Sequence, residues 1–130
     1  MSTRRPTRSQ IEKIVVAALE DIKGKEIEVI NTKKLTSLFE SIVIASGDSN
    51  RQVRSLARNV TDKAREAGID ILSTEGEDAG EWVLVDLGDV VVHIMQPAIR
   101  SYYNLEELWG GKGPLRVREA TQSQATDASA

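Results

Sequence analysis

The stretch WVLVDLGDVVVHIM, residues 82–95, constrains the fold more than any other part of the chain. Its two apolar runs meet at Gly88 and Asp89, which is typical of a tight turn between antiparallel strands. With these two residues in the turn, the side chains on one face of the hairpin are all aliphatic, namely Val83, Val85, Leu87, Val90, Val92 and Ile94. The sequence therefore predicts a hairpin that packs one face into a hydrophobic core.

The opposite face of this hairpin combines large, polar and charged side chains, namely Trp82, Leu84, Asp86, Val91, His93 and Met95. A helix packed on this face explains part of the mixture. It does not explain Asp86, because a purely buried surface has no need of a carboxylate.

The elements around the hairpin alternate between strands and helices. Two amphipathic helices are predicted by capping-box spacing at their start (Ser9 with Glu12, Ser49 with Gln52) and by a glycine at their end (Gly24, Gly68). Short β-branched or alternating runs predict further strands at residues 26–31, 41–46 and 69–73, and a short final helix should carry residues 102–109. This order predicts an α/β sandwich with a mixed sheet of about five strands and flanking helices.

The composition indicates one soluble globular domain, with 130 residues of which 40% are hydrophobic and 28% are charged. The chain has no cysteine and one histidine, which excludes disulfides and thiolate metal sites and favours a cytoplasmic protein without a cofactor. Its apolar runs are too short to span a membrane. We expect a basic disordered tail at residues 1–8, a domain at 9–110 and a second disordered tail at 111–130.

Charge is distributed unevenly along the chain. Between Ser73 and Trp109 there are eight acidic residues, and Arg100 is the only Lys or Arg. This segment would repel a phosphate backbone, so direct recognition of nucleic acid is not expected of it. An acidic surface favours a basic partner instead.

The loop SGDSNRQ, residues 46–52, lies between a predicted strand and a predicted helix, where backbone N–H groups can bind an anion. A nucleotide-binding or nucleotidyltransferase-like enzyme that uses Gly47 to Arg51 is therefore an alternative function. Both glycine-rich phosphate-binding spacings are absent, which favours a turn followed by a capped helix. A stripe of Arg51, Arg54 and Arg58 could contact phosphates, and a solvated face paired with Asp62 and Glu66 explains it equally well.

No catalytic or metal site is predicted. Asp86 and Asp89 invite a metal interpretation, but they lie three residues apart across a turn, on opposite sides of the strand alternation, and converge poorly. His93 lies in mid-strand without a nucleophile signature nearby, which favours a structural role.

Three of the five aromatic residues fall within SYYNLEELWGG, residues 101–111. Helical spacing places Leu105, Leu108 and Trp109 on one side of the final helix, where they would dock it onto the sheet. Tyr102 and Tyr103 cannot both follow them inward. An exposed tyrosine among carboxylates, beside Trp82 and Asp86, is a plausible hot spot for a basic protein.

The segments SIVIASGDSNRQVRSLA, EGEDAGEWVLVDLGDVVVHIM and RSYYNLEELW resemble the ribosomal silencing factor family, also called iojap-related, over about residues 10 to 110. The resemblance implies a non-catalytic factor that binds the large ribosomal subunit at ribosomal protein L-fourteen. It implies that this factor blocks joining of the small subunit and lowers translation when nutrients are short. It also implies a fold related to nucleotidyltransferases, and dimers among members.

The same resemblance implies the residues that contact the partner: Trp82, Asp86, Gly88, Asp89, His93, Arg100, Tyr103 and Leu105, with Trp109 as an anchor or packing group. The chain departs from the family pattern at Glu40-Ser41, where many members have an Asp followed by an aromatic residue. A role for that pair in this chain is not implied.

Overall fold

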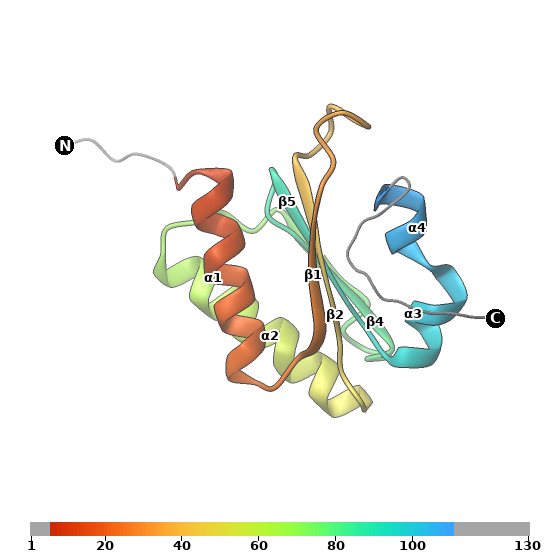
Figure 1. The fold of residues 1–130 in the computed structure, drawn as a ribbon. Helices are drawn as coiled ribbons and strands as arrows, with labels where there is room; N and C mark the ends of the chain where they lie inside the picture. The colour runs from red at the N-terminus through yellow and green to blue at the C-terminus, as the bar shows by residue number, and fades with distance from the viewer. Residues whose placement is uncertain (1–5, 111–130) are drawn as a thin grey trace.

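A mixed five-stranded sheet is the centre of the computed structural model, which describes residues 6–110 (Figure 1). The strand order is β1-β2-β5-β4-β3, and only β2 and β5 pair in parallel. The strands are β1 (Lys25–Asn31), β2 (Ser41–Ser46), β3 (Ser73–Glu75), β4 (Trp82–Asp86) and β5 (Val90–Met95). The predicted mixed sheet with flanking helices is confirmed, and its relation to nucleotidyltransferases stays a prediction. The two predicted tails, except for residues 6–8, lie outside the described residues.

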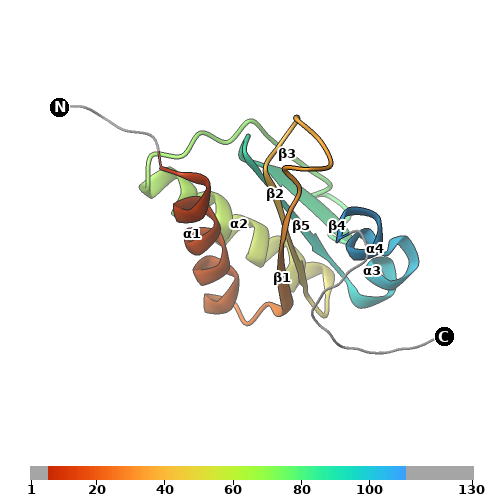
Figure 2. The same ribbon diagram turned by 45° about the horizontal axis from the view of Figure 1, so that its top comes forward.

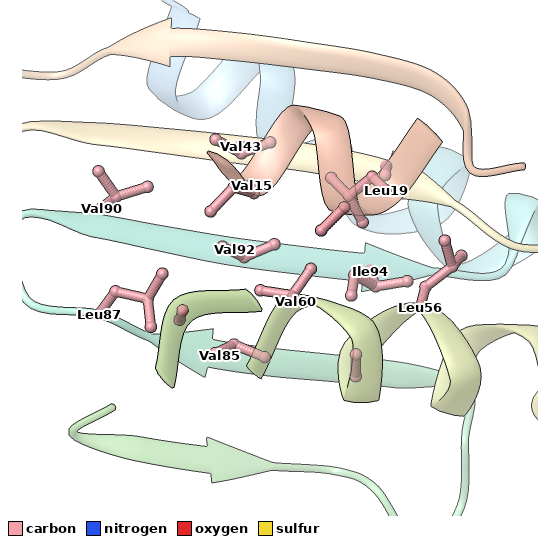
Figure 3. Close-up of a cluster of buried hydrophobic side chains, with 14 of the residues drawn as sticks. Val15, Leu19, Val43, Leu56, Val60, Val85, Leu87, Val90, Val92 and Ile94 are labelled. Atoms are coloured by element: carbon pink, nitrogen blue, oxygen red, sulfur yellow. The ribbon is translucent and has the colours of Figure 1, made fainter. Parts of the chain in front are cut away.

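Helices cover both faces of this sheet. On one face lie α1 (Arg8–Asp21) and α2 (Asn50–Glu66), and on the other lie α3 (Pro97–Tyr103) and α4 (Leu105–Gly110) (Figures 1 and 2). The core beneath α1 and α2 contains the aliphatic face of the hairpin, and Figure 3 labels Val15, Leu19, Val43, Leu56, Val60, Val85, Leu87, Val90, Val92 and Ile94. Burial of each such side chain contributes about 1.5–3 kcal/mol to folding.

The predicted register of the hairpin is confirmed. Val85 pairs with Val92, and Leu84 pairs with His93. Gly88 has a φ of 91°, which an L side chain rarely adopts. This turn therefore fixes which side chains face the core and which face α3 and α4.

The first helix begins earlier than the sequence prediction. Thr7, not Ser9, is its N-cap: the Thr7 hydroxyl accepts a hydrogen bond from the Gln10 N–H at 3.2 Å, and the Gln10 side chain accepts one from the Thr7 N–H at 2.8 Å. The same spacing thus occurs two residues upstream. The earlier start is favoured because it adds backbone hydrogen bonds, such as Ile11 N–H to the Thr7 carbonyl at 2.9 Å, and keeps the cap.

The second helix begins and ends as predicted. The Ser49 hydroxyl accepts a hydrogen bond from the Gln52 N–H at 3.0 Å. At the other end, Ala67 is the C-cap and Gly68 has a φ of 79°.

The strand predicted at residues 69–73 is wrong, because β3 begins at Ser73. The N–H of Ile69 donates to the Ala64 carbonyl at 2.9 Å, and the Ile69 side chain is buried in the core. This part of the segment therefore completes the end of α2 and cannot form hydrogen bonds with the β-sheet. Pairing with β4 is reached only near Leu72, whose N–H donates to the Asp86 carbonyl at 2.8 Å.

The single final helix is also wrong, because Asn104 divides it into α3 and α4. Asn104 has φ 49° and ψ 57°, a left-handed conformation that asparagine tolerates and that ends a helix. The break places Tyr103 at the end of α3 and changes the orientation of the next turn. Leu105 is buried, but Leu108, which was expected to dock, is 66% exposed.

Candidate functional site

Four rings contact one another in succession from the sheet to the surface, in tilted or edge-on arrangements. We call them the aromatic ladder: His93 of β5, Trp82 of β4, and Tyr103 and Tyr102 of α3. Ring centroids are 5.8 Å apart for Trp82 and His93, 4.8 Å for Trp82 and Tyr103, and 4.9 Å for the two tyrosines. Exposure rises along the ladder, from 8% at His93 to 51% at Tyr103 and 80% at Tyr102. The ladder therefore presents aromatic surface to solvent from a buried base.

His93 is the base of this ladder. Its Nδ1 accepts a hydrogen bond from the indole N–H of Trp82 at 3.0 Å. Burial lowers the pKa of His93 from 6.5 to about 4, so the ring is neutral at pH 7. With Nδ1 as the acceptor, the proton of the neutral ring is on Nε2. The structure places this predicted contact residue beneath Trp82, where it faces little solvent.

Arg100 holds α3 and α4 against the sheet. It is 6% exposed. Its Nε donates to Glu106 of α4 at 2.7 Å, and one terminal nitrogen donates to the Ser46 hydroxyl of β2 at 2.8 Å. The other terminal nitrogen lies 3.8 Å from Glu28 of β1. The guanidinium therefore links four elements.

Leu105 and Trp109 attach α4 in the same region. Leu105 packs with Ile42 and Ile44 of β2 in a second buried cluster. The Trp109 ring lies edge-on to Phe39, with centroids 5.2 Å apart. Of the predicted contact residues, Arg100, Leu105 and Trp109 thus hold the helices in place, and Tyr103 faces outward.

The predicted contact residues at the hairpin turn form a separate group. Asp86 accepts a hydrogen bond from the Gly88 N–H at 2.9 Å, and the Asp89 carbonyl accepts from the N–H groups of Glu40 (2.7 Å) and Ser41 (3.0 Å). Trp82 and Asp86 are at opposite ends of β4, roughly 13 Å apart along a strand that rises about 3.3 Å per residue. The structure therefore does not bring all the predicted residues into one site.

Asp86 and Asp89 do not form part of a metal-binding cluster. Within residues 6–110, no group of three His, Cys, Asp or Glu side chains is arranged to hold a metal ion. The Asp86 carboxylate instead closes the turn through its bond to Gly88.

Polar side chains in the loop at Gly47 to Arg51 form hydrogen bonds and an ion pair with other parts of this protein. The Ser49 hydroxyl caps α2, and Asp48 forms an ion pair with Lys25 at 2.5 Å. A Cβ on Gly47 would lie 3.0 Å from a methyl group of Val53, so the glycine allows close packing of the helix start. A carboxylate in this loop opposes a bound phosphate, and this geometry favours the interpretation as a turn and a cap.

The stripe of Arg51, Arg54 and Arg58 on α2 is exposed, but the ion pairs expected for these three residues do not form. Asp62 pairs with Arg65 at 3.7 Å, and Glu66 pairs with Lys63 at 3.8 Å. Each of these two acidic residues thus pairs with a basic residue three positions away in the last turns of α2, which is nearer in the sequence than any arginine of the stripe. The Arg54 guanidinium instead donates to the Asp78 carbonyl at 3.3 Å, in the acidic loop before β4.

The sequence prediction missed Tyr102 as a member of the ladder and Phe39 as the neighbour of Trp109. The signal for Tyr102 was present, since it precedes Tyr103, but the break at Asn104 decides that both tyrosines share the last turn of α3.

For the part of the chain that the structure describes, no helix is both long and apolar enough to cross a bilayer.

Comparison with known proteins agrees with the resemblance seen in the sequence. The family model described as "Ribosomal silencing factor during starvation" matches residues 5–130. A Chromobacterium violaceum protein named ribosomal silencing factor RsfS is 59% identical over 105 residues, which cover 81% of this chain and 86% of that protein. The Bacillus subtilis protein of the same name is 43% identical over 103 residues, covering 79% and 87% of the two chains.

A solved structure shows the same fold. A crystal structure from Chromobacterium violaceum superposes with a TM-score of 0.80 at 54% sequence identity, covering 89% of this chain and 97% of the other. The sequence match extends over most of both chains, and the fold agrees with it. The chain therefore belongs to the ribosomal silencing factor family.

Proposed function

We propose that this protein binds the large ribosomal subunit at ribosomal protein L-fourteen and sterically blocks joining of the small subunit, lowering translation when nutrients are short. Membership of the family supports the ribosomal role. The observation that carries the proposed contact is the aromatic ladder, whose outer rings, Tyr103 and Tyr102, are 51% and 80% exposed. Aromatic side chains such as tyrosine and tryptophan are typical anchors of a protein interface.

The charge of the chain segment that contains the ladder supports a basic partner. The segment from Ser73 to Trp109 carries eight acidic residues and one Lys or Arg, which is Arg100. Arg100 is buried and paired with Glu106, so these two charges offset each other and the other seven acidic residues of the segment remain. An acidic surface attracts a basic protein over distances of about 10 Å at moderate salt and repels RNA phosphates.

The proposed mechanism requires no chemistry on the part of this protein, and no cofactor. Trp82 and Tyr103 would contact the partner directly, with Asp86, Gly88 and Asp89 as a second contact at the hairpin turn. The remaining predicted residues, His93, Arg100, Leu105 and Trp109, would support that surface from within. Inhibition follows because the bound factor occupies the space that the small subunit needs. The same proposal places the protein in the cytoplasm. Formation of a homodimer stays a prediction, and sedimentation equilibrium would test it.

Sedimentation with separated ribosomal subunits tests the partner, and light scattering tests the block. The purified protein should sediment with large subunits and slow their joining to small subunits. Tyr103→Ala and Trp82→Ala should weaken both effects, because loss of an interface anchor commonly costs about 2 kcal/mol or more. Leu35→Ala is the matched control, since Leu35 is 54% exposed but lies in the loop between β1 and β2.

The ladder is not the contact surface if Trp82→Ala and Tyr103→Ala, folded by circular dichroism, block joining as well as the unmodified protein. Calorimetry with nucleoside triphosphates and magnesium tests the alternative loop function. Saturable binding that is lost on Arg51→Ala would favour a nucleotide-binding protein over a steric factor.

A further inference from the structure

The hydrogen bond between Trp82 and His93 determines how the ladder is held. An indole has one polar hydrogen, on Nε1, and in this structure Nδ1 of His93 accepts it at 3.0 Å. Trp82 then contacts Tyr103, with ring centroids 4.8 Å apart. The orientation of the exposed tyrosine therefore depends on the indole, and that of the indole depends on the imidazole.

The side chains beside His93 in the sheet do not compete with Trp82 for a hydrogen bond to Nδ1. In the sheet, His93 lies between Ile44 of β2 and Leu84 of β4, which offer no side-chain hydrogen bonds. The ring is 8% exposed, so water has little access to it. A buried acceptor with one donor fixes the geometry of that donor more firmly than an exposed pair does.

We propose that His93 is a positioning residue for the partner-binding surface: it fixes the Trp82 indole, and through it Tyr103, in the orientation that the partner recognises. This inference rests on the proposed function. It replaces the expectation that His93 itself contacts the partner.

The chemistry that Trp82 presents follows from this arrangement. Because its N–H is bonded to His93, the indole has no hydrogen bond to offer a partner, and only its ring face and edge remain. Such a ring suits the side chain of a lysine or an arginine, which is attracted to the face of an indole. Loss of the His93 acceptor would free the N–H and allow the ring to turn.

Indole hydrogen exchange, followed by NMR on the full chain labelled with nitrogen-15, tests the positioning directly. The chain has two tryptophans, and the Trp109 indole, which packs edge-on against Phe39 and forms no hydrogen bond within residues 6–110, serves as the internal reference. The Trp82 N–H should exchange more slowly than that of Trp109. His93→Leu should remove this difference, and His93→Asn, whose side-chain oxygen can accept the bond, should keep it. Equal exchange in the unmodified protein would overturn the proposal without any variant.

Binding to purified ribosomal protein L-fourteen tests the consequence. His93→Leu should weaken binding about threefold to tenfold, the effect of one net hydrogen bond, and His93→Asn should restore most of it. In a Trp82→Phe background, His93→Leu should have no further effect, because there is no indole N–H to hold. An equal loss in that background, or unchanged binding with a freed indole, would overturn the proposal.

Different results would contradict the proposed surface and the positioning role of His93. If Trp82→Ala binds L-fourteen as tightly as the unmodified protein, the proposed surface is wrong and the positioning role falls with it. If Trp82→Ala weakens binding but His93→Leu does not, the surface stands and only the positioning role is wrong.

Discussion

Acid should destabilise this protein through His93 well above the pH at which most of its carboxylates titrate. Burial lowers the pKa of His93 from 6.5 to about 4 in the folded protein. In the unfolded chain the imidazole takes up a proton near its ordinary pKa of about 6.5. Between these two values the unfolded state binds more protons than the folded state, so the free energy of unfolding falls as the pH is lowered through this window.

The size of this effect follows from the pKa values. One pKa unit corresponds to about 1.4 kcal/mol, so the change from 6.5 to about 4 corresponds to about 3 kcal/mol, with a maximum slope of about 1.4 kcal/mol per pH unit. The structural reason is twofold. The charged ring would be desolvated between Ile44 and Leu84, and a proton on Nδ1 would face the N–H of Trp82.

Urea denaturation, followed by circular dichroism at pH values from 7.5 down to 4, measures this dependence. His93→Asn is the control, because the chain has no other histidine and its carboxylates are common to both proteins. The difference between the two curves should change by about 3 kcal/mol between pH 6.5 and 4 and should be flat above pH 7. Parallel curves in this window, or an NMR titration of His93 with a midpoint near 6.5, would refute the reasoning.

Three further predictions concern stability and are measured by urea denaturation. Leu56→Ala should cost about 2–5 kcal/mol, because the side chain of Leu56 on α2 is completely buried, whereas Leu35→Ala, at an exposed position, should change the free energy of unfolding by less than about 0.5 kcal/mol. Gly76→Ala should be far more destabilising than Gly68→Ala: both glycines have positive φ, but a Cβ at Gly76 would lie 2.0 Å from the Trp82 carbonyl oxygen, and one at Gly68 would meet nothing within 4 Å. Arg100→Met should cost about 1–3 kcal/mol and loosen α4, since it removes the hydrogen bonds to Glu106 and Ser46, and Arg100→Lys should not restore both of these bonds.

The hairpin shows how far local sequence reasoning reaches. Its turn at Gly88 and Asp89 sets the register of β4 against β5, and the strand alternation then assigns every side chain to a face. The Ser49 cap and the Gly68 stop are equally local, and both were predicted. Each of these features depends on residues within a few positions of one another.

The predictions of helix and strand positions were wrong where two local sequence signals favoured different structures. Thr7 and Ser9 both offer capping spacing, and only the extra backbone bonds of the longer helix favour Thr7. Residues 69–73 alternate like a strand, but the end of α2 takes the N–H of Ile69. Leu108 fits the apolar spacing of one continuous helix, and the left-handed Asn104 turns it outward.

Part of the candidate site could also be predicted from the sequence. Trp82 and Tyr103 were identified, and the ladder bond between Trp82 and His93 follows from the register, because His93 pairs with Leu84 and is therefore a diagonal neighbour of Trp82 on the same face. The role of Arg100 was not within reach. Its partner Ser46 lies 54 positions away in the sequence, and its burial depends on α3 and α4 packing over the sheet.

The sequence by itself determines the helix signals, the hairpin register and the existence of an acidic, aromatic segment, because these arise from neighbouring residues and from composition. Only the tertiary structure decides which of those residues face solvent. Tyr102 and Tyr103 are exposed, whereas His93 and Arg100 are buried and paired. The physical reason is that burial depends on contacts between elements far apart in the chain, and a polar side chain can be buried only where such a contact supplies its hydrogen-bond partner.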